Sequence, residues 1–565
     1  MKPVDDLLQQ RLSRAQLLRA AAVLGIAGPA SASLARGAAA QGWAAAAVRP
    51  AVSRFQGGKS SITVAMPDTP PGLDDDQLLN ALTEKVAVNC YSHDMVGFKV
   101  KNDSEFGGQM ADILAPGSEG IDPGFAESWQ VSADGRTYTF KLRDDVGSPW
   151  GNKLTAEDVK WSFDRRKALK GVGGFMTDVM LVKSPDDVKV VDPQTVSITI
   201  SAPNPAFFKI DAIMWYGGVF DSQEAKKHAT GDDPWATQWL ATNTAGFGPY
   251  HVQDLVQGQG LRLVANPNWY KGKPPIEQIV WRAIPSAADR LALLSRGDVD
   301  IAEGLTGEQL KGLAGTGDVQ VISRPSNIIR SLILNMQKPE LKDVRVRQAI
   351  AYAVPYDQII QSVFFGEADR QRSPVPAMYP GYTDKYWVYD TNVEKAKSLL
   401  KEAGSQPFKL PVTFDSSSAE DQLIANILQT ALGEIGIEVV QDKVPTAVFS
   451  QKIGKKQDYA YLAQNWPLVA DSGYALWVYW FSTNFLNAAN YNNPEFDSLL
   501  TSGMGTLDET QRTEAFRKAQ EIYERDQPWV ILVNQRFQLP MSRKLSGFVW
   551  YTDNHVHYEH LTAAG

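Results

Sequence analysis

The residues best suited to binding a small molecule are aromatic and lie in one short segment. Within twenty residues the chain places Trp466, Tyr474, Trp477, Tyr479, Trp480, Phe481 and Phe485. Tryptophan and tyrosine faces stack on planar rings, sugars and cations, and flat apolar walls with a few polar anchors are typical of small-molecule clefts. Each single ring can equally belong to a buried core, so we expect most of them to be core and at least one to line a cleft.

Sequence motifs for catalysis and nucleotide binding are absent. The chain has no G-x-S-x-G, H-E-x-x-H, C-x-x-C or complete phosphate-loop pattern. Gly57-Gly58-Lys59-Ser60 resembles the end of a phosphate loop, but Ser53 stands where its first glycine is required. The single cysteine, Cys90, excludes an intramolecular disulfide and a cysteine-rich metal site. The absence of these motifs therefore favours a binding protein without a cofactor over an enzyme.

Histidines near the C-terminus leave a metal-binding alternative open. Three of the six histidines are His555, His557 and His560. On a β-strand, His555 and His557 would point to the same face and could share a metal ion. The other interpretation is a C-terminal strand with its polar residues in solvent. A role in binding a metal or metallophore thus stands beside the binding of another small solute.

Length and composition predict a multidomain protein that does not bind nucleic acid. The chain has 565 residues, 44% hydrophobic and 21% charged, which predicts two or three domains. Its formal net charge is −8, whereas a general nucleic-acid binder needs a basic face.

The first forty residues are typical of a secretory signal. Arg11, Arg14 and Arg19 precede a low-charge run over residues 20–35, which is too short for a membrane helix. Ala38-Ala39-Ala40 fits a signal cleavage site, and residues 41–57 read as a flexible lead-in to the mature protein. We therefore expect residues 1–40 to be a signal peptide and the mature protein to be periplasmic.

The signal also bears on the export route. Residues 13–19 resemble the twin-arginine pattern, but Ala15 stands where the second arginine belongs. The sequence thus leaves the general and the twin-arginine routes open. No cysteine follows the apolar run, so we expect a free protein rather than a lipoprotein.

The body of the chain alternates predicted strands and helices. Strand-like alternation predicts strands at 61–66, 138–142, 196–200, 437–440 and 529–533, and helical spacing predicts helices from 155, over 392–403 and over 511–525. Asp134-Gly135 predicts a hairpin turn, because aspartate-glycine tolerates the positive φ that such turns need. Thr155 and Asp158 form a predicted capping box. The alternation indicates an α/β protein.

A series of short segments, in a fixed order, carries a family resemblance. They are residues 123–129 (PGFAESW), 134–135 (DG), 138–143 (YTFKLR), 154–159 (LTAEDV), 248–250 (GPY), 266–270 (NPNWY), 297–301 (GDVDI), 343–350 (DVRVRQAI), 396–404 (AKSLLKEAG) and 493–497 (NPEFD). In this order they resemble the extracytoplasmic solute-binding proteins of family 5, which serve peptide, dipeptide and nickel ABC importers.

The resemblance implies an α/β, two-lobed periplasmic-binding-protein-like fold of class II, with an extra domain inserted in the first lobe. Two crossing segments near residues 328 and 533 would form the hinge between the lobes. The implied division is lobe I at 58–98, 206–328 and 533–565, inserted domain II at 99–205, and lobe II at 329–532.

The resemblance also implies the function. A family member captures a peptide-like or other small solute between its lobes and delivers it to the permease subunits of an ABC importer, which a cytoplasmic ATPase drives. We expect a monomer without enzymatic activity or cofactor and without nucleic-acid partners. The alternatives are a metal- or metallophore-binding importer component and a periplasmic hydrolase with a closable cleft, which would need a nucleophile and a base in contact.

The family pattern suggests candidate ligand-binding residues. Peptide-binding members hold the ligand's amino terminus with an aspartate shortly after a tryptophan. Here Trp466 matches that tryptophan, but Val469 occupies the anchoring position, and the nearest acid is Asp471. We predict that Trp466, Asp471 and Tyr474 line the cleft, with Asp471 as a polar anchor. Weaker candidates near the expected lobe edges are Tyr91, Glu303 and Arg330, the last as a bidentate donor to a carboxylate.

Overall fold

The fold is described from a computed structural model of the chain. It describes residues 60–78, 80–91, 95–115, 118–213, 218–313, 315 and 317–564. The predicted signal peptide and the lead-in at 41–57 lie outside the described residues. Within the described part, no helix is long and apolar enough to cross a membrane.

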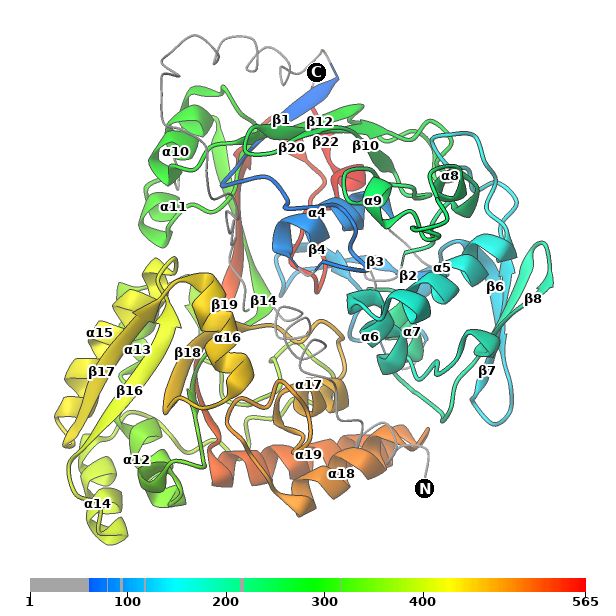
Figure 1. Ribbon diagram of the computed structural model, residues 1–565. Helices are drawn as coiled ribbons and strands as arrows, with labels where there is room; N and C mark the ends of the chain where they lie inside the picture. Colours follow the sequence, from blue (N-terminus) through cyan, green and yellow to red (C-terminus); the bar gives the residue numbers. More distant parts are fainter. Residues whose placement is uncertain are drawn as a thin grey trace.

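One large mixed sheet runs from the upper to the lower part of the molecule (Figure 1). Its central strands are largely buried and rich in Val, Ile and Leu, the composition expected of strands inside an α/β protein, whereas the edge strand β17 alternates buried and exposed residues. In spatial order they are β10 (Tyr250–Val256), β11 (Gly260–Ala265), β12 (Gln278–Ala283), β1 (Ser61–Met66), β13 (Ile301–Ala302), β19 (Trp529–Ser542), β14 (Val319–Leu334), β18 (Ala460–Asn465), β16 (Phe408–Asp415) and β17 (Ile437–Val444), with β15 (Ala368–Asp369) beside β19.

Two long antiparallel strands join two bodies of the molecule. β14 and β19 have 16 and 14 residues, and in Figure 1 they run from the upper body to the lower one. Their pairing is interrupted between Arg324 and Ile328, about halfway along. We name residues 60–318 and 543–564 the first lobe and residues 335–528 the second lobe. The interruption between the lobes is a natural place for a bend.

Helices pack around the sheets in both lobes. Their bounds are α4 Ala81–Cys90, α5 Ala156–Leu169, α6 Val172–Val179, α7 Phe207–Asp211, α8 Ser222–Lys227, α9 Thr237–Leu240, α10 Ala287–Arg296, α11 Gly307–Leu313, α12 Val344–Ala353, α13 Tyr356–Ser362, α14 Val393–Ala403, α15 Ala419–Gly433, α16 Thr446–Lys455, α17 Ser472–Trp480, α18 Pro494–Met504 and α19 Glu509–Asp526. The predicted helix at 392–403 is confirmed: Asn392 caps the N-terminus of α14, and Gly404 ends it with a φ of 66°.

A separate four-stranded antiparallel sheet lies to the right in Figure 1. It contains β6 (Ala126–Val131), β7 (Thr137–Leu142), β9 (Thr195–Thr199) and β8 (Val188–Asp192), and α5 packs on β8 and β9. The predicted hairpin turn is confirmed, because Gly135 joins β6 to β7 with a φ of 68°. The predicted capping box is also confirmed, with Thr155 and Asp158 at the start of α5.

Residues 100–111, which the predicted domain division assigns to inserted domain II, pack against the C-terminal part of the chain. β3 (Val100–Asp103) and β4 (Gly108–Ala111) form a small sheet with β21 (Val549–Trp550), near the C-terminus of the chain. This beginning of the predicted inserted domain is therefore tied to the first lobe. The remaining strands are β2 (Val96–Phe98) paired with β5 (Ile121–Pro123), and β20 (Leu545–Ser546) paired with β22 (Thr562–Ala563).

Candidate binding site between the lobes

The loop that follows β18 holds Trp466 at the crossing of the two lobes. Trp466 is half-buried and packs on the main core. Asn327, on the interrupted part of β14, donates from Nδ2 to the carbonyl oxygens of Pro467 (3.0 Å) and Thr552 (2.8 Å). Asn554 donates to Asn327 Oδ1 at 2.7 Å. One buried amide therefore ties the Trp466 loop of the second lobe to the C-terminal segment of the first.

Asp471 has internal partners for both carboxylate oxygens. Its Oδ1 accepts from the backbone N–H of Tyr474 (2.9 Å) and so caps α17. Its Oδ2 forms an ion pair with Arg512 of α19, whose side chain is 4% exposed. Val469, at the position where the family places its anchoring aspartate, is fully buried. The structure thus gives Asp471 two roles within the second lobe.

Lys209 connects the lobes directly. This residue of α7 is buried, and its Nζ donates to the carbonyl oxygens of Ala470 (3.2 Å) in the second lobe and Ile113 (3.3 Å) in the first. Burial lowers the pKa of Lys209, while the Asp471 carboxylate acts in the opposite direction. A charged ammonium group with carbonyl partners on both sides favours the approach of the two lobes.

A narrow crevice lies beside this contact. Its volume is about 50 Å³, and its two walls come from different lobes. The lining residues are Val179, Leu181, Pro203, Asn204, Ala206 and Ile210 on one side, and Asp471, Tyr474, Trp477, Phe481, Thr501, Met504 and Arg512 on the other. Asp471 and Tyr474 are thus placed together in one hollow.

Most of the aromatic segment belongs to the core, as the sequence analysis expected. Every residue of α17 is buried. The Trp480 ring packs against Tyr479, Tyr523 and Trp529 at centroid distances of 4.9–5.6 Å. Edge-on packing of this kind stabilises the second lobe beyond simple burial of area.

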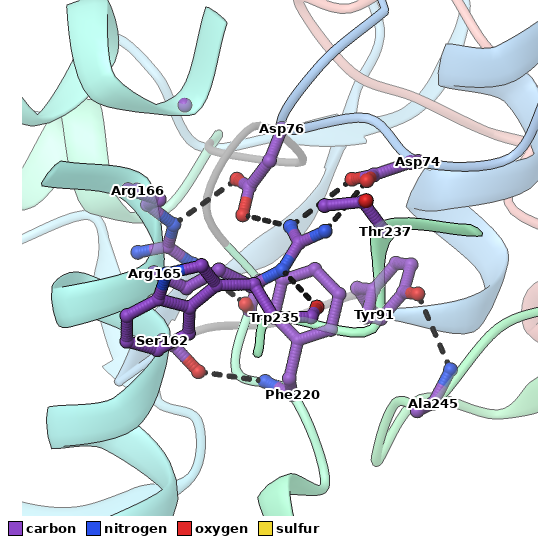
Figure 2. A network of polar contacts seen from close by, with 12 residues as sticks. Asp74, Asp76, Tyr91, Ser162, Arg165, Arg166, Phe220, Trp235, Thr237 and Ala245 are labelled. Atoms are coloured by element: carbon purple, nitrogen blue, oxygen red, sulfur yellow. Dashed lines mark hydrogen bonds and ion pairs between the residues drawn. The ribbon is translucent and has the colours of Figure 1, made fainter. Parts of the chain in front are cut away.

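Tyr91 lies inside the first lobe and not beside Trp466. Its ring is 1% exposed and packs on Phe220, and its hydroxyl accepts from the backbone N–H of Ala245 at 3.2 Å (Figure 2). Burial raises the pKa of the Tyr91 hydroxyl well above its ordinary value. The residue therefore has a packing role in the described structure.

Figure 2 shows a buried charge network close to Tyr91. Arg165 of α5 forms ion pairs with Asp74 (2.5 Å) and Asp76 (2.6 Å), and Arg166 pairs with Asp76 at 3.3 Å. Asp75, between these acids, is 1% exposed, and its carboxyl oxygens have no hydrogen-bond partner among the described residues. Burial, reinforced by the neighbouring carboxylates, raises the pKa of Asp75 well above its ordinary value. The network joins the segment after β1 to α5.

The two remaining candidates also form ion pairs with other residues of the protein. Glu303 forms a salt bridge with Lys85 at 2.7 Å, near the first-lobe end of β19. Arg330 of β14 is 6% exposed and forms an ion pair with Asp421 of α15 at 2.5 Å. In the described structure the Arg330 guanidinium binds this internal carboxylate.

The C-terminal histidines do not share a metal-binding face. Residues 555–557 are not a strand, so the alternation on which the metal alternative depended is wrong. His555 faces Glu84 of α4 at 3.4 Å, and His557 faces Asp553 at 2.8 Å. Burial disfavours the charged imidazole of His557, but Asp553 outweighs it and raises the pKa of His557 to about 10. Within the described residues, no group of three His, Cys, Asp or Glu side chains could hold a metal ion.

The structure thus places two of the six predicted residues, Asp471 and Tyr474, on one crevice, holds Trp466 in the loop that precedes them, and places the other three elsewhere. It adds Lys209, Asn327 and Arg512 to this region. Nothing in the local sequence of these three indicates a role, because their partners are 41 to 261 residues away along the chain.

Comparisons with known proteins agree with this architecture. Residues 120–494 match the family model described as bacterial extracellular solute-binding proteins, family 5. The probable D,D-dipeptide-binding periplasmic protein DdpA of Escherichia coli is 32% identical, over 77% of this chain and 83% of that protein. The dipeptide-binding protein of Escherichia coli is 27% identical, over 79% and 87% of the two chains. Heme-binding protein A of Haemophilus influenzae is also 27% identical, over 77% and 82%.

Solved structures show the same fold. The periplasmic binding protein DppA from Helicobacter pylori, in complex with the peptide STSA, superposes with a TM-score of 0.75 at 23% identity, over 89% of this chain and 98% of that one. The substrate-binding protein CtaP from Listeria monocytogenes gives a TM-score of 0.76 at 21% identity, over 89% and 99%. The chain therefore belongs to family 5 of the bacterial extracellular solute-binding proteins, non-catalytic proteins that bind the solute for an ABC importer.

Proposed function

We propose that this protein captures a short peptide or a peptide-like solute in the periplasm and delivers it to the permease of an ABC importer. The names of its relatives support this class of ligand, since they include binding proteins for D,D-dipeptides, dipeptides and glutathione. The relatives DdpA and DppA are named as periplasmic proteins. Export through the signal at residues 1–40, a monomeric state and a separate ATPase subunit are parts of the same proposal.

The observation that carries the proposal is the contact between lobes beside the Trp466 loop. Two strands, β14 and β19, join the lobes, and Lys209 meets the carbonyl oxygen of Ala470 across the gap. A solute that contacts both lobes stabilises the closed form relative to the open one, because it gains its full set of contacts only there. The permease then distinguishes the loaded protein by its closed shape.

Trp466 is the residue that we propose for direct ligand contact. Its ring is half-buried, so one part of it packs on the core and the other part is accessible to a ligand. Asp471 and Tyr474 follow it in the same segment and line the neighbouring crevice. Stacking on the Trp466 ring suits the flat faces of peptide groups and of aromatic side chains.

Thermal unfolding with defined peptides tests the proposal. The panel is Gly-Gly, Ala-Ala, D-Ala-D-Ala and glutathione, with sucrose and spermidine as ligands of other classes. A ligand at a hundred times its Kd stabilises the folded state by about 2.7 kcal/mol, and we expect a peptide to raise Tm by roughly 5–10 °C for an unfolding unit of the size of the second lobe.

Trp466→Ala should abolish this shift, while Trp239→Ala, which removes a half-buried first-lobe tryptophan stacked on His228, should retain it. A shift with sucrose or spermidine and none with any peptide would overturn the proposed ligand class.

A further inference from the structure

The crevice between the lobes has a defined chemistry of its own. Its walls are mostly apolar, and its two charged groups, Asp471 and Arg512, neutralise each other in an ion pair. A charged group entering this space would lose its water and find no free counter-charge, which is costly. The crevice therefore suits an uncharged, apolar group.

The size of the crevice limits this group. A cavity of 150 Å³ accepts a benzene ring of six heavy atoms, and the crevice offers about 50 Å³. By that comparison it accommodates roughly two to four heavy atoms, about the size of an isopropyl group. It is too small to hold a whole solute and large enough for the end of a branched side chain.

Trp477 also lines this wall and is 9% exposed. Its indole nitrogen is itself buried, so the ring presents apolar carbon surface to the crevice. The wall formed by Trp477 is therefore apolar.

The crevice exists only where the two lobes meet. Ala206 and Ile210 come from the first lobe, whereas Trp477, Thr501 and Met504 come from the second. A group that fills this space therefore contacts both lobes, and it binds the closed form better than any form in which they are apart. Occupation of the crevice and closure are coupled.

We infer that this crevice is a subsite for a small branched apolar group, such as the end of a valine or leucine side chain in the captured solute. The assignment of the group to a peptide rests on the proposed function, whereas the chemistry of the crevice does not. The subsite makes the protein select hydrophobic peptides over Gly-Gly.

The first experiment tests the crevice without any peptide. Isobutyramide, an isopropyl group on a carbonyl, is titrated into ¹⁵N-labelled protein, and the indole resonance of Trp477 is followed after assignment with Trp477→Phe. We expect a saturable shift with a Kd on the order of 1–10 mM, and a much smaller one with acetamide.

Ala206→Leu and Thr501→Leu fill the crevice from opposite walls and should each abolish the isobutyramide shift. The matched control Val440→Leu, at an exposed position on β17, should retain it. A shift that never saturates, or that persists in both filling variants, overturns the inference and leaves the proposed function intact.

The second experiment measures peptide selectivity by calorimetry. Wild-type protein should bind Gly-Leu on the order of 10- to 100-fold more tightly than Gly-Gly, and Ala206→Leu should remove this preference. Equal affinity of the wild type for the two peptides would refute the subsite, whereas a saturable isobutyramide site in a protein that binds no peptide would refute only the proposed ligand class.

Discussion

Replacing Asp471 with asparagine separates an internal role of this carboxylate from a role as the anchor of a ligand's amino group. Asparagine can still cap α17 through the Tyr474 N–H, but it removes the negative charge that faces Arg512. Breaking a buried ion pair by removing one partner costs about 3–5 kcal/mol. We expect the lower end of this range, because Arg512 keeps a hydrogen bond to the Gly503 carbonyl at 3.0 Å and a contact with Glu509 at 3.3 Å.

The expected loss of about 3 kcal/mol corresponds to a Tm roughly 6–12 °C lower for a unit of the size of the second lobe. Scanning calorimetry of the ligand-free protein measures it. Asp508→Asn is the matched control, because Asp508 caps the exposed start of α19 without a buried ion pair, and it should change Tm by no more than about 2 °C.

Binding measurements then decide between the two roles. If Asp471 acts through Arg512 and α17, Asp471→Asn changes the affinities for Ala-Ala and for N-acetyl-Ala-Ala by the same factor. The reasoning is refuted if Asp471→Asn leaves Tm unchanged but weakens Ala-Ala selectively, because the carboxylate would then serve the ligand's ammonium group.

Three further predictions concern other buried charges. Arg165→Met should destabilise the protein by at least about 3 kcal/mol in urea unfolding, because it leaves Asp74 buried and unpaired. Arg296 is exposed, so the control Arg296→Met should cost under about 1 kcal/mol. Equal losses in the two variants would contradict this prediction. The pKa of about 10 for His557 lies above its value of about 6.5 in the unfolded chain, so the protonated imidazole stabilises the fold fully below pH 6.5, and this contribution is lost as the pH rises towards 10. The free energy of urea unfolding should therefore decline over this pH range, and His557→Gln should flatten the decline. An unchanged slope in the variant would contradict this prediction. Lys209→Met should raise the Kd for a bound peptide about tenfold, measured by calorimetry, because it removes the cationic donor to the Ala470 carbonyl; an unchanged Kd would show that this contact does not contribute to closure.

Local patterns predicted individual elements well where the deciding interactions lie within a few residues. The capping box at Thr155, the cap and stop of α14 and the turn at Gly135 follow from contacts between near neighbours in the chain, and the structure confirms each of them. The prediction of a C-terminal strand that would align His555 with His557 was wrong, because long-range partners such as Glu84 determine how that segment packs.

The candidate site was predicted less completely than the fold. The aromatic segment and the family resemblance located Trp466, Asp471 and Tyr474, and the structure places the last two on one crevice. Sequence reasoning treated Asp471 and Arg330 as available for a ligand, since an isolated charged residue carries no sign of its partner. Their internal partners, Arg512 and Asp421, are 41 and 91 residues away.

By itself, the sequence determined the class of the molecule: an α/β protein with no motif for catalysis and with a series of segments in the order that marks a solute-binding family. These properties depend on composition, periodicity and local order, which a linear chain displays directly. Only the tertiary structure decided which charges are neutralised inside the protein, that Lys209 spans the two lobes, and that a small apolar crevice forms between them. Such features arise where distant segments meet, and the distance between two side chains in space is not encoded in their separation along the chain.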